Sequence, residues 1–552
     1  MKLRTHVGVA LVAAGTLLVP AVSPQPVATA SPAQRGPDAR CEALVGTAIP
    51  ATVTSLPTRG GHVDASSSVT ESISGVNVTY CRVHAALSPI DRSAPDIEMR
   101  VALPLRWNHR SMMLGGGGYN GTIPDIRGNV PFGPRDAPTP LARGYATYAS
   151  DSGHQADPAQ HPVSSLDGSF AMNDEALRNF AAGDALKKTH DAALFLIRQW
   201  YRAKPRHMYF TGGSTGGREA LAVIQRWPHV FSGVISAYPA WNNLAEALYL
   251  GYATRLLAKP GAFPGAGKQT LLYDSVIRDC DGLDGLADGI VSNPEGCHFE
   301  PAQLRCPNGD DIGPTCLSDR QIKAVKAISS PWEWPYEVAS GERSYPGFPF
   351  LSGADMRTPL LGWGTTPPST PMPLTSGYGM QYWDQWVKYF LTRDPTRDSL
   401  SVAPDRPGQW RERISELSQV QDINDADLRP FARSGGKLLL VHGAADELVS
   451  HRSTNDYYTR VVETVGHRTA RGFMRYYLVP GANHANVGNP AFAAEWDSIT
   501  AIERWAEQNR EPRAPVVTDA ATGRSRPMCE YPRWPAYRTG NPDSADSFEC
   551  ST

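Results

Sequence analysis

The chain has 552 residues, of which 41% are hydrophobic and 20% charged, proportions typical of a globular protein with a large core. Its 53 basic and 55 acidic side chains leave a net charge of −2. There is no basic excess to bind phosphate backbones, so we expect no nucleic-acid partner.

Residues 1–30 have the pattern of a secretory signal peptide. Lys2 and Arg4 precede an apolar run over residues 7–22, and residues 28–30 supply the small side chains of a cleavage site. The run is short for a membrane span, although a retained N-terminal anchor is the alternative. The sequence therefore predicts a secreted, extracellular protein with no membrane partner.

Short apolar strands alternate with helices in residues 31–243, and the same rhythm resumes in residues 413–552. This alternation predicts an α/β fold with a parallel sheet. We expect strands at 96–104, 110–114, 207–211, 231–237, 437–441 and 476–479, and helices at 182–201 and 218–227.

Residues 244–412 are rich in proline, glycine and aromatic side chains. We expect this stretch to be a large insertion that forms a lid over the site, because loop insertions at a site usually carry function. An independent domain that touches no substrate is the alternative.

Eight cysteines fit export, because an even number in a secreted chain suggests disulfide bonds. They lie in close pairs along the sequence, which favours bonds between nearest neighbours as a hypothesis. The eight are Cys41, Cys81, Cys280, Cys297, Cys306, Cys316, Cys529 and Cys550.

Residues 212–216 read Gly-Gly-Ser-Thr-Gly, which matches the G-x-S-x-G nucleophile elbow of α/β hydrolases. A predicted strand precedes the motif and a predicted helix follows it, as the elbow requires. We therefore predict that Ser214 is a nucleophile. A glycine-rich turn without chemistry is the alternative.

An acid and a histidine follow the serine in α/β hydrolases, in that order. Asp446 follows the apolar strand at 437–441, and His484 follows the one at 476–479. Both would lie at the carboxyl end of the sheet, where sites gather, and would activate Ser214 as a triad. The rivals lack this placement; they are Glu447, Asp456, His190, His442, His451 and His467.

The oxyanion formed during ester cleavage needs backbone N–H donors. Thr215, directly after the nucleophile, is the first candidate. The glycine run at 115–118 follows a predicted strand and supplies the second, from Gly117 or Gly118. A phosphate-binding loop is the rival reading of these glycines, but no Lys-Ser/Thr pair follows them.

Together these motifs resemble the tannase/feruloyl esterase family, which includes mono(2-hydroxyethyl) terephthalate hydrolases. The resemblance covers nearly the whole mature chain. It depends on the runs Ser214–Arg218, Asp151–His154 and His442–Asp446, and on Pro480 and Gly481 before His484. It implies an α/β-hydrolase fold with a large inserted lid domain, and hydrolysis of aromatic acyl esters.

One departure from the family concerns the residues beside the triad. The family usually has a cysteine directly before the serine and another directly after the histidine, joined as a disulfide bond. Here these positions are Gly213 and Ala485. The triad residues themselves are present, so the resemblance still implies an esterase.

Residues 281–290 combine three carboxylates with three glycines. A turning loop of this kind lets oxygen ligands converge on a hard cation such as calcium. The loop also resembles the family's structural calcium site in the lid. The implied ligands are the side chains of Asp281, Asp284 and Asp288 and the carbonyl groups of Leu286 and Ile290. A solvated acidic turn is the alternative.

The sequence thus predicts a secreted serine carboxylic-ester hydrolase that forms an acyl-enzyme. Its expected substrate is a small aromatic ester, or a polysaccharide or polyphenol that carries feruloyl, other hydroxycinnamoyl, galloyl or related groups. Two alternatives remain open: an acyltransferase with the same triad, and a ligand-binding protein on a hydrolase scaffold.

Overall fold

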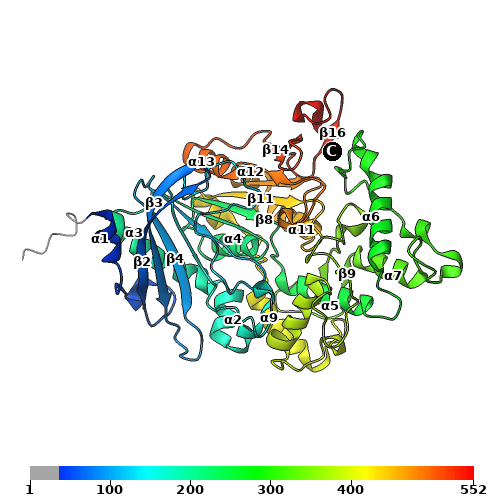
Figure 1. Cartoon of the computed structure of the whole chain (residues 1–552), viewed down its shortest axis with the longest axis horizontal. Coiled ribbons are helices and arrows are strands. Elements are labelled where there is room, and N and C mark those ends of the chain that lie inside the picture. The colour runs from blue at the N-terminus through cyan, green and yellow to red at the C-terminus, as the bar shows by residue number, and fades with distance from the viewer. Residues whose placement is uncertain (1–35) are drawn as a thin grey trace, which may run out of the picture.

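The computed structural model describes residues 36–552 (Figure 1). The signal peptide predicted at residues 1–30 lies outside the described residues.

A ten-stranded sheet forms the centre of the molecule, in the order β1-β2-β3-β4-β6-β5-β7-β8-β11-β12. The first strands pair antiparallel as far as β6, and the strands from β6 to β12 pair parallel. The bounds are β1 Ala48–Ile49, β2 Gly61–Ile73, β3 Val76–Leu87, β4 Ile97–Pro104, β5 Arg110–Leu114, β6 Ala146–Ser150, β7 His207–Gly213, β8 Gly233–Ala237, β11 Lys437–Gly443 and β12 Met474–Val479.

Alternate residues of the central strands pack on opposite faces of the sheet, as the two-residue period of a strand requires. Leu438 and Leu440 of β11 belong to the apolar cluster that also contains residues of α3, α4 and α11. Leu439 and Val441 belong to the cluster on the other face, which includes residues of α13. Since both faces are covered, the parallel strands are predominantly apolar.

The helices cover the sheet or form the segment between β8 and β11. Their bounds are α1 Pro37–Glu42, α2 Asp174–Ala181, α3 Asp184–Tyr201, α4 Thr215–Arg226, α5 Asn243–Leu257, α6 Ala266–Cys280, α7 Asp319–Ile328, α8 Tyr378–Gln385, α9 Arg411–Gln421, α10 Arg429–Arg433, α11 His451–Val465, α12 His467–Phe473 and α13 Ser498–Gln508. The elements predicted from the sequence are all present.

The segment between β8 and β11 adds no strand to the main sheet in the described chain, and it lies beside and below the sheet in Figure 1. It holds α5 to α10 and the small hairpin of β9 Trp332–Glu333 and β10 Ser344–Tyr345. Its apolar side chains share a third cluster with Tyr119 and with α2. The insertion therefore packs against the sheet domain. The domain boundaries after residues 243 and 412 stay a prediction.

Short strands near the C-terminus form two small sheets. One contains β13 Ala494–Glu495, β14 Val516–Asp519 and β15 Ser525–Pro527, and the other contains β16 Trp534–Tyr537 and β17 Phe548–Ser551.

Four disulfide bonds join the cysteines in consecutive pairs along the sequence, as the spacing suggested. The pairs are Cys41–Cys81, Cys280–Cys297, Cys306–Cys316 and Cys529–Cys550. The second pair brackets the acidic loop at 281–290, and the fourth joins the last strand to the segment before β16.

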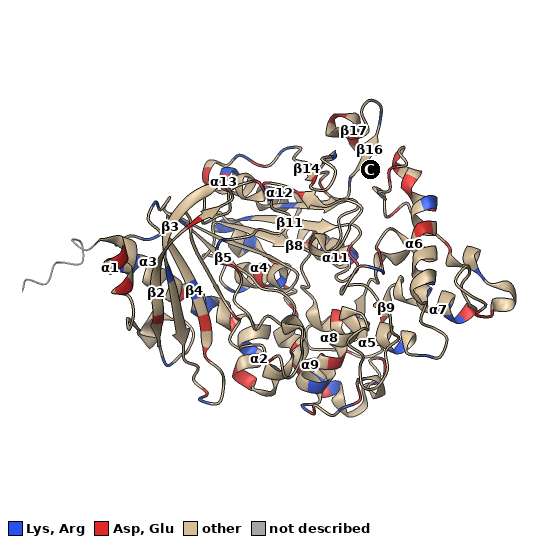
Figure 2. Ribbon diagram, in the orientation of Figure 1, with Lys and Arg blue, Asp and Glu red and all other residues tan. Residues whose placement is uncertain are grey.

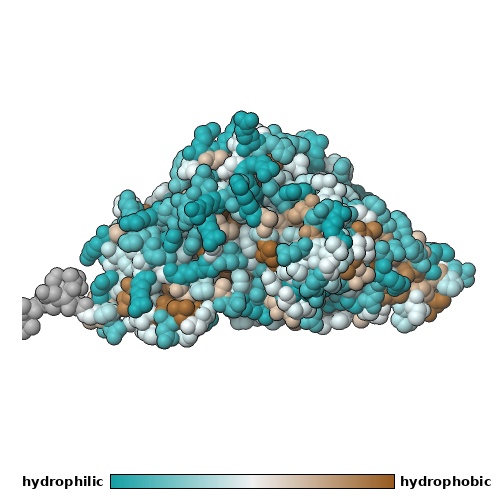
Figure 3. Space-filling model, turned by 90° about the horizontal axis from the view of Figure 1, so that it is seen from above, coloured by the Kyte–Doolittle hydropathy of each residue, from teal (hydrophilic) through white to brown (hydrophobic). Residues whose placement is uncertain are grey.

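The surface is mixed in charge and mainly polar. Basic and acidic residues are interspersed along the helices and loops (Figure 2), and the face seen from above is largely hydrophilic (Figure 3). None of the helices in residues 36–552 is both long and apolar enough to cross a membrane.

Candidate active site

Ser214 occupies a sharp turn between β7 and α4. Its backbone has φ 60° and ψ −125°, a combination that L-residues rarely adopt and that functional sites often retain. The Ser214 N–H donates to the carbonyl oxygen of Ala237 at 3.1 Å, which holds the turn against β8. This is the strand–turn–helix geometry of a nucleophile elbow.

The glycines on either side of Ser214 permit close packing. A Cβ atom on Gly212 would lie 2.4 Å from the carbonyl oxygen of Gly216. One on Gly216 would lie 2.6 Å from the carbonyl oxygen of Gly116. Any side chain at either position would therefore push α4 away from the sheet or from the glycine loop.

Asp446 and His484, which are 38 residues apart in sequence, meet directly. His484 Nδ1 lies 2.8 Å from Asp446 Oδ2, and the carboxylate also accepts the N–H groups of Leu448 and Val449 at 2.9 and 2.8 Å. Burial alone would raise the pKa of Asp446, but the facing His484 and His442 outweigh it and hold this pKa well below its usual range.

Two of the rival residues support this pair. His442 Nε2 lies 3.2 Å from Asp446 Oδ2, and its ring is held by Thr454 and the carbonyl group of Val449. Glu447 accepts the backbone N–H of His484 at 3.3 Å. His442 therefore holds the Asp446 carboxylate in place, and Glu447 holds the backbone of His484. No hydrogen bond joins Ser214 to His484 among the described residues.

The glycine loop lies against the start of α4. Thr215 Oγ1 donates to the carbonyl oxygen of Gly118 at 2.7 Å, and the Gly216 N–H donates to Gly116 at 3.0 Å. Within residues 36–552, the backbone N–H groups of Thr215, Gly117 and Gly118 have no hydrogen-bond acceptor. Thr215 and Gly118 line the same small cavity as Ser214, so their N–H groups are free for an incoming oxygen atom.

A buried carboxylate fixes the glycine loop. Glu219 of α4 is only 1% exposed and accepts the Gly116 N–H at 2.9 Å and the side-chain amide of Asn120 at 2.6 Å. Burial raises its pKa, and these donors lower it in part. Sequence analysis missed Glu219, although it follows the serine motif by one helical turn.

The Asp151–His154 segment holds the other side of the loop. Asp151 accepts the backbone N–H of Gly153 at 2.8 Å and that of Glu98 at 3.1 Å. His154 Nε2 lies 2.9 Å from the carbonyl oxygen of Tyr119, and burial lowers the pKa of His154 to about 3. The neutral His154 ring thus holds the backbone at Tyr119, directly after the glycine loop.

Tyr238 is a second residue that sequence analysis missed. It follows β8 directly, and its ring centroid lies 4.7 Å from that of His484. A Cβ atom on Gly213 would lie 2.4 Å from the Tyr238 ring. The ring thus fills the space that a side chain beside Ser214 would need, and it packs the Ser214 turn against His484.

A small cavity opens beside the serine. Its volume of about 20 Å³ is room for roughly one water molecule. It is lined by Gly118, Ser214, Thr215, Ala240, Asn243, Glu246, Leu250, Tyr378, Tyr382, Leu448 and Val449. Both the sheet domain and the segment between β8 and β11 therefore form its wall.

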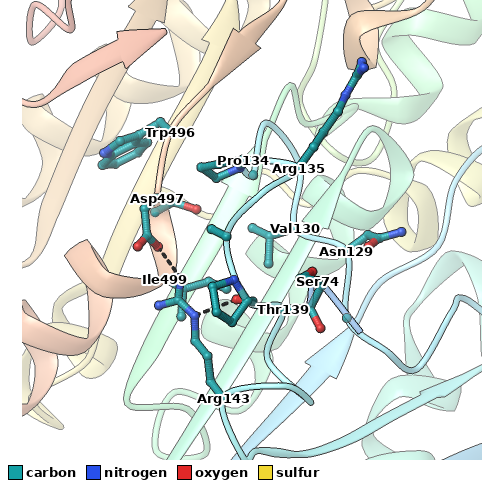
Figure 4. A pocket seen from close by; sticks show the side chains of 15 residues that line it. Ser74, Asn129, Val130, Pro134, Arg135, Thr139, Arg143, Trp496, Asp497 and Ile499 are labelled. Atoms are coloured by element: carbon teal, nitrogen blue, oxygen red, sulfur yellow. Dashed lines mark hydrogen bonds and ion pairs between the residues drawn. The ribbon is translucent and has the colours of Figure 1, made fainter. Parts of the chain in front are cut away.

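A larger hollow of about 300 Å³ lies elsewhere, between the 128–143 loop and the start of α13 (Figure 4). It contains none of the predicted catalytic residues. Arg143 at its edge is held by Asp497 at 2.9 Å and Thr500 at 2.8 Å, so its charge serves the structure. The cavity at Ser214 is the better candidate site, because it joins a strained serine to free N–H donors.

The acidic loop predicted to bind calcium is held partly by protein groups. Asp281 accepts the N–H groups of Asp288, Gly289 and Ile290 at 2.9–3.1 Å. Asp288 is paired with Arg526. Asp284 Oδ2 is buried without a partner, so the oxygen chemistry suits calcium. However, no group of three or more metal-ligating side chains converges in the described chain.

The covered mixed sheet and the strained serine turn together define an α/β hydrolase. The model of the family described as "Tannase and feruloyl esterase" matches residues 81–551. The chain therefore belongs to the tannase and feruloyl esterase family and is a carboxylic-ester hydrolase.

Individual relatives support this assignment. The chain is 35% identical over 542 residues to an uncharacterized esterase of Agrobacterium fabrum, with 95% of each chain covered. It is 28% identical over 532 residues to mono(2-hydroxyethyl) terephthalate hydrolase of Piscinibacter sakaiensis, with 86% of this chain and 85% of that one covered. The crystal structure of feruloyl esterase B from Aspergillus oryzae shares the fold, with a TM-score of 0.73 and 22% identity over 89% of this chain and 97% of that one.

The contact between Gly213 and Tyr238 gives a test of the site's packing. We expect Gly213→Ala to lower kcat for p-nitrophenyl acetate at least about tenfold, because the new methyl group must displace the ring that packs on His484. Gly472→Ala is the control, since a Cβ atom there meets nothing within 4 Å. Equal kcat values for the two variants would contradict this account.

Proposed function

We propose that the protein is a serine esterase that cleaves aromatic carboxylic esters through an acyl-enzyme. Ser214 is the nucleophile, His484 the base and Asp446 the residue that orients the histidine. The observation that carries the proposal is the 2.8 Å contact between His484 Nδ1 and Asp446. It leaves Nε2 of His484 as the nitrogen that exchanges protons with Ser214.

The reaction proceeds in two steps. In the first, Ser214 Oγ attacks the ester carbonyl carbon while His484 Nε2 takes the hydroxyl proton. The resulting oxyanion is stabilised by N–H groups of Thr215 and of Gly117 or Gly118. When the bond between the carbonyl carbon and the alcohol oxygen breaks, His484 returns the proton to the leaving alcohol. In the second step, water activated by His484 attacks the acyl-enzyme and releases the acid.

The segment at 244–412 acts as a lid in this proposal. Leu250, Tyr378 and Tyr382 form part of the cavity wall at Ser214. An aromatic acyl group needs far more room than about 20 Å³, since ligand sites usually measure several hundred Å³. Side chains of this segment must therefore move when the ester binds.

Ser214→Ala tests the nucleophile. We expect a loss of at least about 10³-fold in kcat for whichever ester is cleaved best among methyl ferulate, methyl gallate, mono(2-hydroxyethyl) terephthalate and p-nitrophenyl acetate. Ser72→Ala, on an exposed part of β2, is the control. Mass spectrometry of the quenched wild type should find the acyl group on Ser214.

Retention of activity in Ser214→Ala would refute the mechanism. Transfer of the acyl group to an added alcohol in preference to water would instead favour the acyltransferase alternative.

We further propose that the loop at 281–290 binds a structural calcium ion through Asp281, Asp284, Asp288 and the carbonyl groups of Leu286 and Ile290. The unpartnered oxygen of Asp284 supports this proposal. The ion would neutralise the carboxylates of the insertion without taking part in the reaction.

Removing calcium should lower the melting temperature of the wild type by a few degrees, because a ligand that binds only the folded state stabilises it. Asp284→Asn should abolish the difference between calcium-loaded and chelated protein. If chelation leaves the wild type unchanged, Arg526 and the backbone N–H groups close the loop without a metal ion.

We propose that the protein is secreted after removal of residues 1–30. The four disulfide bonds support an oxidising destination. N-terminal sequencing of protein from the culture medium should begin near Ser31, and the intact mass should show no free thiol. A membrane-bound product that retains residues 1–30 would contradict the proposal.

A further inference from the structure

Glu246 lies in the cavity beside the proposed nucleophile. It belongs to the first turn of α5 and lines this cavity together with Ser214 and Thr215. Its side chain is nevertheless deeply buried, since the residue is only 4% exposed. A carboxyl group thus stands in a site whose other walls are largely apolar, aromatic or backbone.

This carboxyl group has no hydrogen-bond or ion-pair partner among the described residues. Burial raises the pKa of Glu246 well above its usual range, and the negative charge of Asp446 adds to the shift; no hydrogen bond opposes them. Other buried carboxyl groups differ in this respect. Glu219 accepts bonds from Gly116 and Asn120, and Glu342 is paired with Arg460 at 2.6 Å.

The polar neighbours of Glu246 are already committed to other groups. The Tyr378 hydroxyl donates to the carbonyl oxygen of Ser165 at 2.9 Å. The Tyr382 hydroxyl accepts the side-chain amide of Asn243 at 3.0 Å. Apart from the Ser214 hydroxyl, Glu246 is therefore the polar side chain of the cavity wall, among the described residues, that remains available to an entering group.

A neutral carboxyl group both donates and accepts hydrogen bonds, as does a hydroxyl group. Because an unpartnered buried polar group destabilises the folded chain, its retention at this position is explained by a partner that arrives with the ligand. An ester that carries a hydroxyl group would supply both a donor and an acceptor.

We propose that Glu246 determines specificity by forming a hydrogen bond with a hydroxyl group of the ester substrate. The inference rests on the proposed function, because it assumes that the ester occupies this cavity when it reaches Ser214. The hydroxyl group belongs either to the acyl ring or to the alcohol, and these two sources are distinguishable.

The test compares kcat/KM for two matched pairs of esters. Methyl 4-hydroxycinnamate and methyl cinnamate differ in a hydroxyl group on the acyl ring. The esters 2-hydroxyethyl benzoate and propyl benzoate differ in a hydroxyl group on the alcohol. We expect the wild type to prefer the hydroxylated member of one pair at least tenfold, because a site built to bind a hydroxyl group rejects the analogue that lacks it.

Glu246→Leu should reduce this preference at least tenfold, whereas Glu246→Gln, which keeps a donor and an acceptor, should retain most of it. Leu250→Ala is the matched control, because it enlarges the same cavity without removing a polar group and should change both members of a pair by a similar factor. If the leucine variant fails to fold, Glu246→Met of similar length carries the same test.

An unchanged preference in Glu246→Leu, or no preference in the wild type, would overturn the inference. Hydrolysis of p-nitrophenyl acetate, which has no hydroxyl group, separates this failure from that of the proposed function. If Ser214-dependent hydrolysis persists while the preference is unaffected, only the role of Glu246 falls. If Ser214→Ala retains full activity, the proposed function falls and the inference with it.

Discussion

The close approach of α4 to the glycine loop is the contact on which the site depends. Gly216 lies against the carbonyl group of Gly116 so closely that no side chain fits between them. This contact brings Thr215 within hydrogen-bond distance of Gly118 and places their N–H groups beside Ser214. A short, crowded turn therefore places both the half-buried serine and the donors around it.

The same packing obliges α4 to bury two charged side chains. Glu219 faces the glycine loop, and its carboxylate is satisfied by donors of that loop. Arg218 faces the opposite way and donates to the carbonyl groups of Gln421 and Ala181. Because these carbonyl groups end α9 and α2, the helix after the serine also anchors α9, which overlaps the predicted end of the insertion at residue 412. Arg218 thus links the helix that begins at the Ser214 turn to the ends of α9 and α2.

The sheet domain could be predicted well because its strands are apolar and their spacing is regular. The sequence could place Asp446 and His484 at the carboxyl end of the sheet because each lies a few residues after such a strand. The start of α4 was predicted three residues late, since Gly216 and Gly217 disfavour helix. Tertiary packing requires these glycines, and the helix begins at Thr215.

Other features depend on contacts that no local pattern reveals. Tyr238 also follows a strand, but a tyrosine there carries no distinctive chemistry. Glu246 occupies the first turn of a helix, where an acidic residue is ordinary, and only tertiary burial makes it unusual. Arg526, which pairs with Asp288, is 238 residues away from it in the sequence.

Three buried carboxyl groups of this region are distinguished by the groups that face them. Asp446 receives two backbone N–H groups and faces two histidines, which holds its pKa low. Burial and the charge of Asp446 raise the pKa of both Glu447 and Glu246. Since like charges in a dry site cannot all ionise, the two histidines that face Asp446 select it as the carboxylate. The negative charge that faces His484 is then located on Asp446, while burial holds the pKa of Glu246 on the cavity wall well above its usual range.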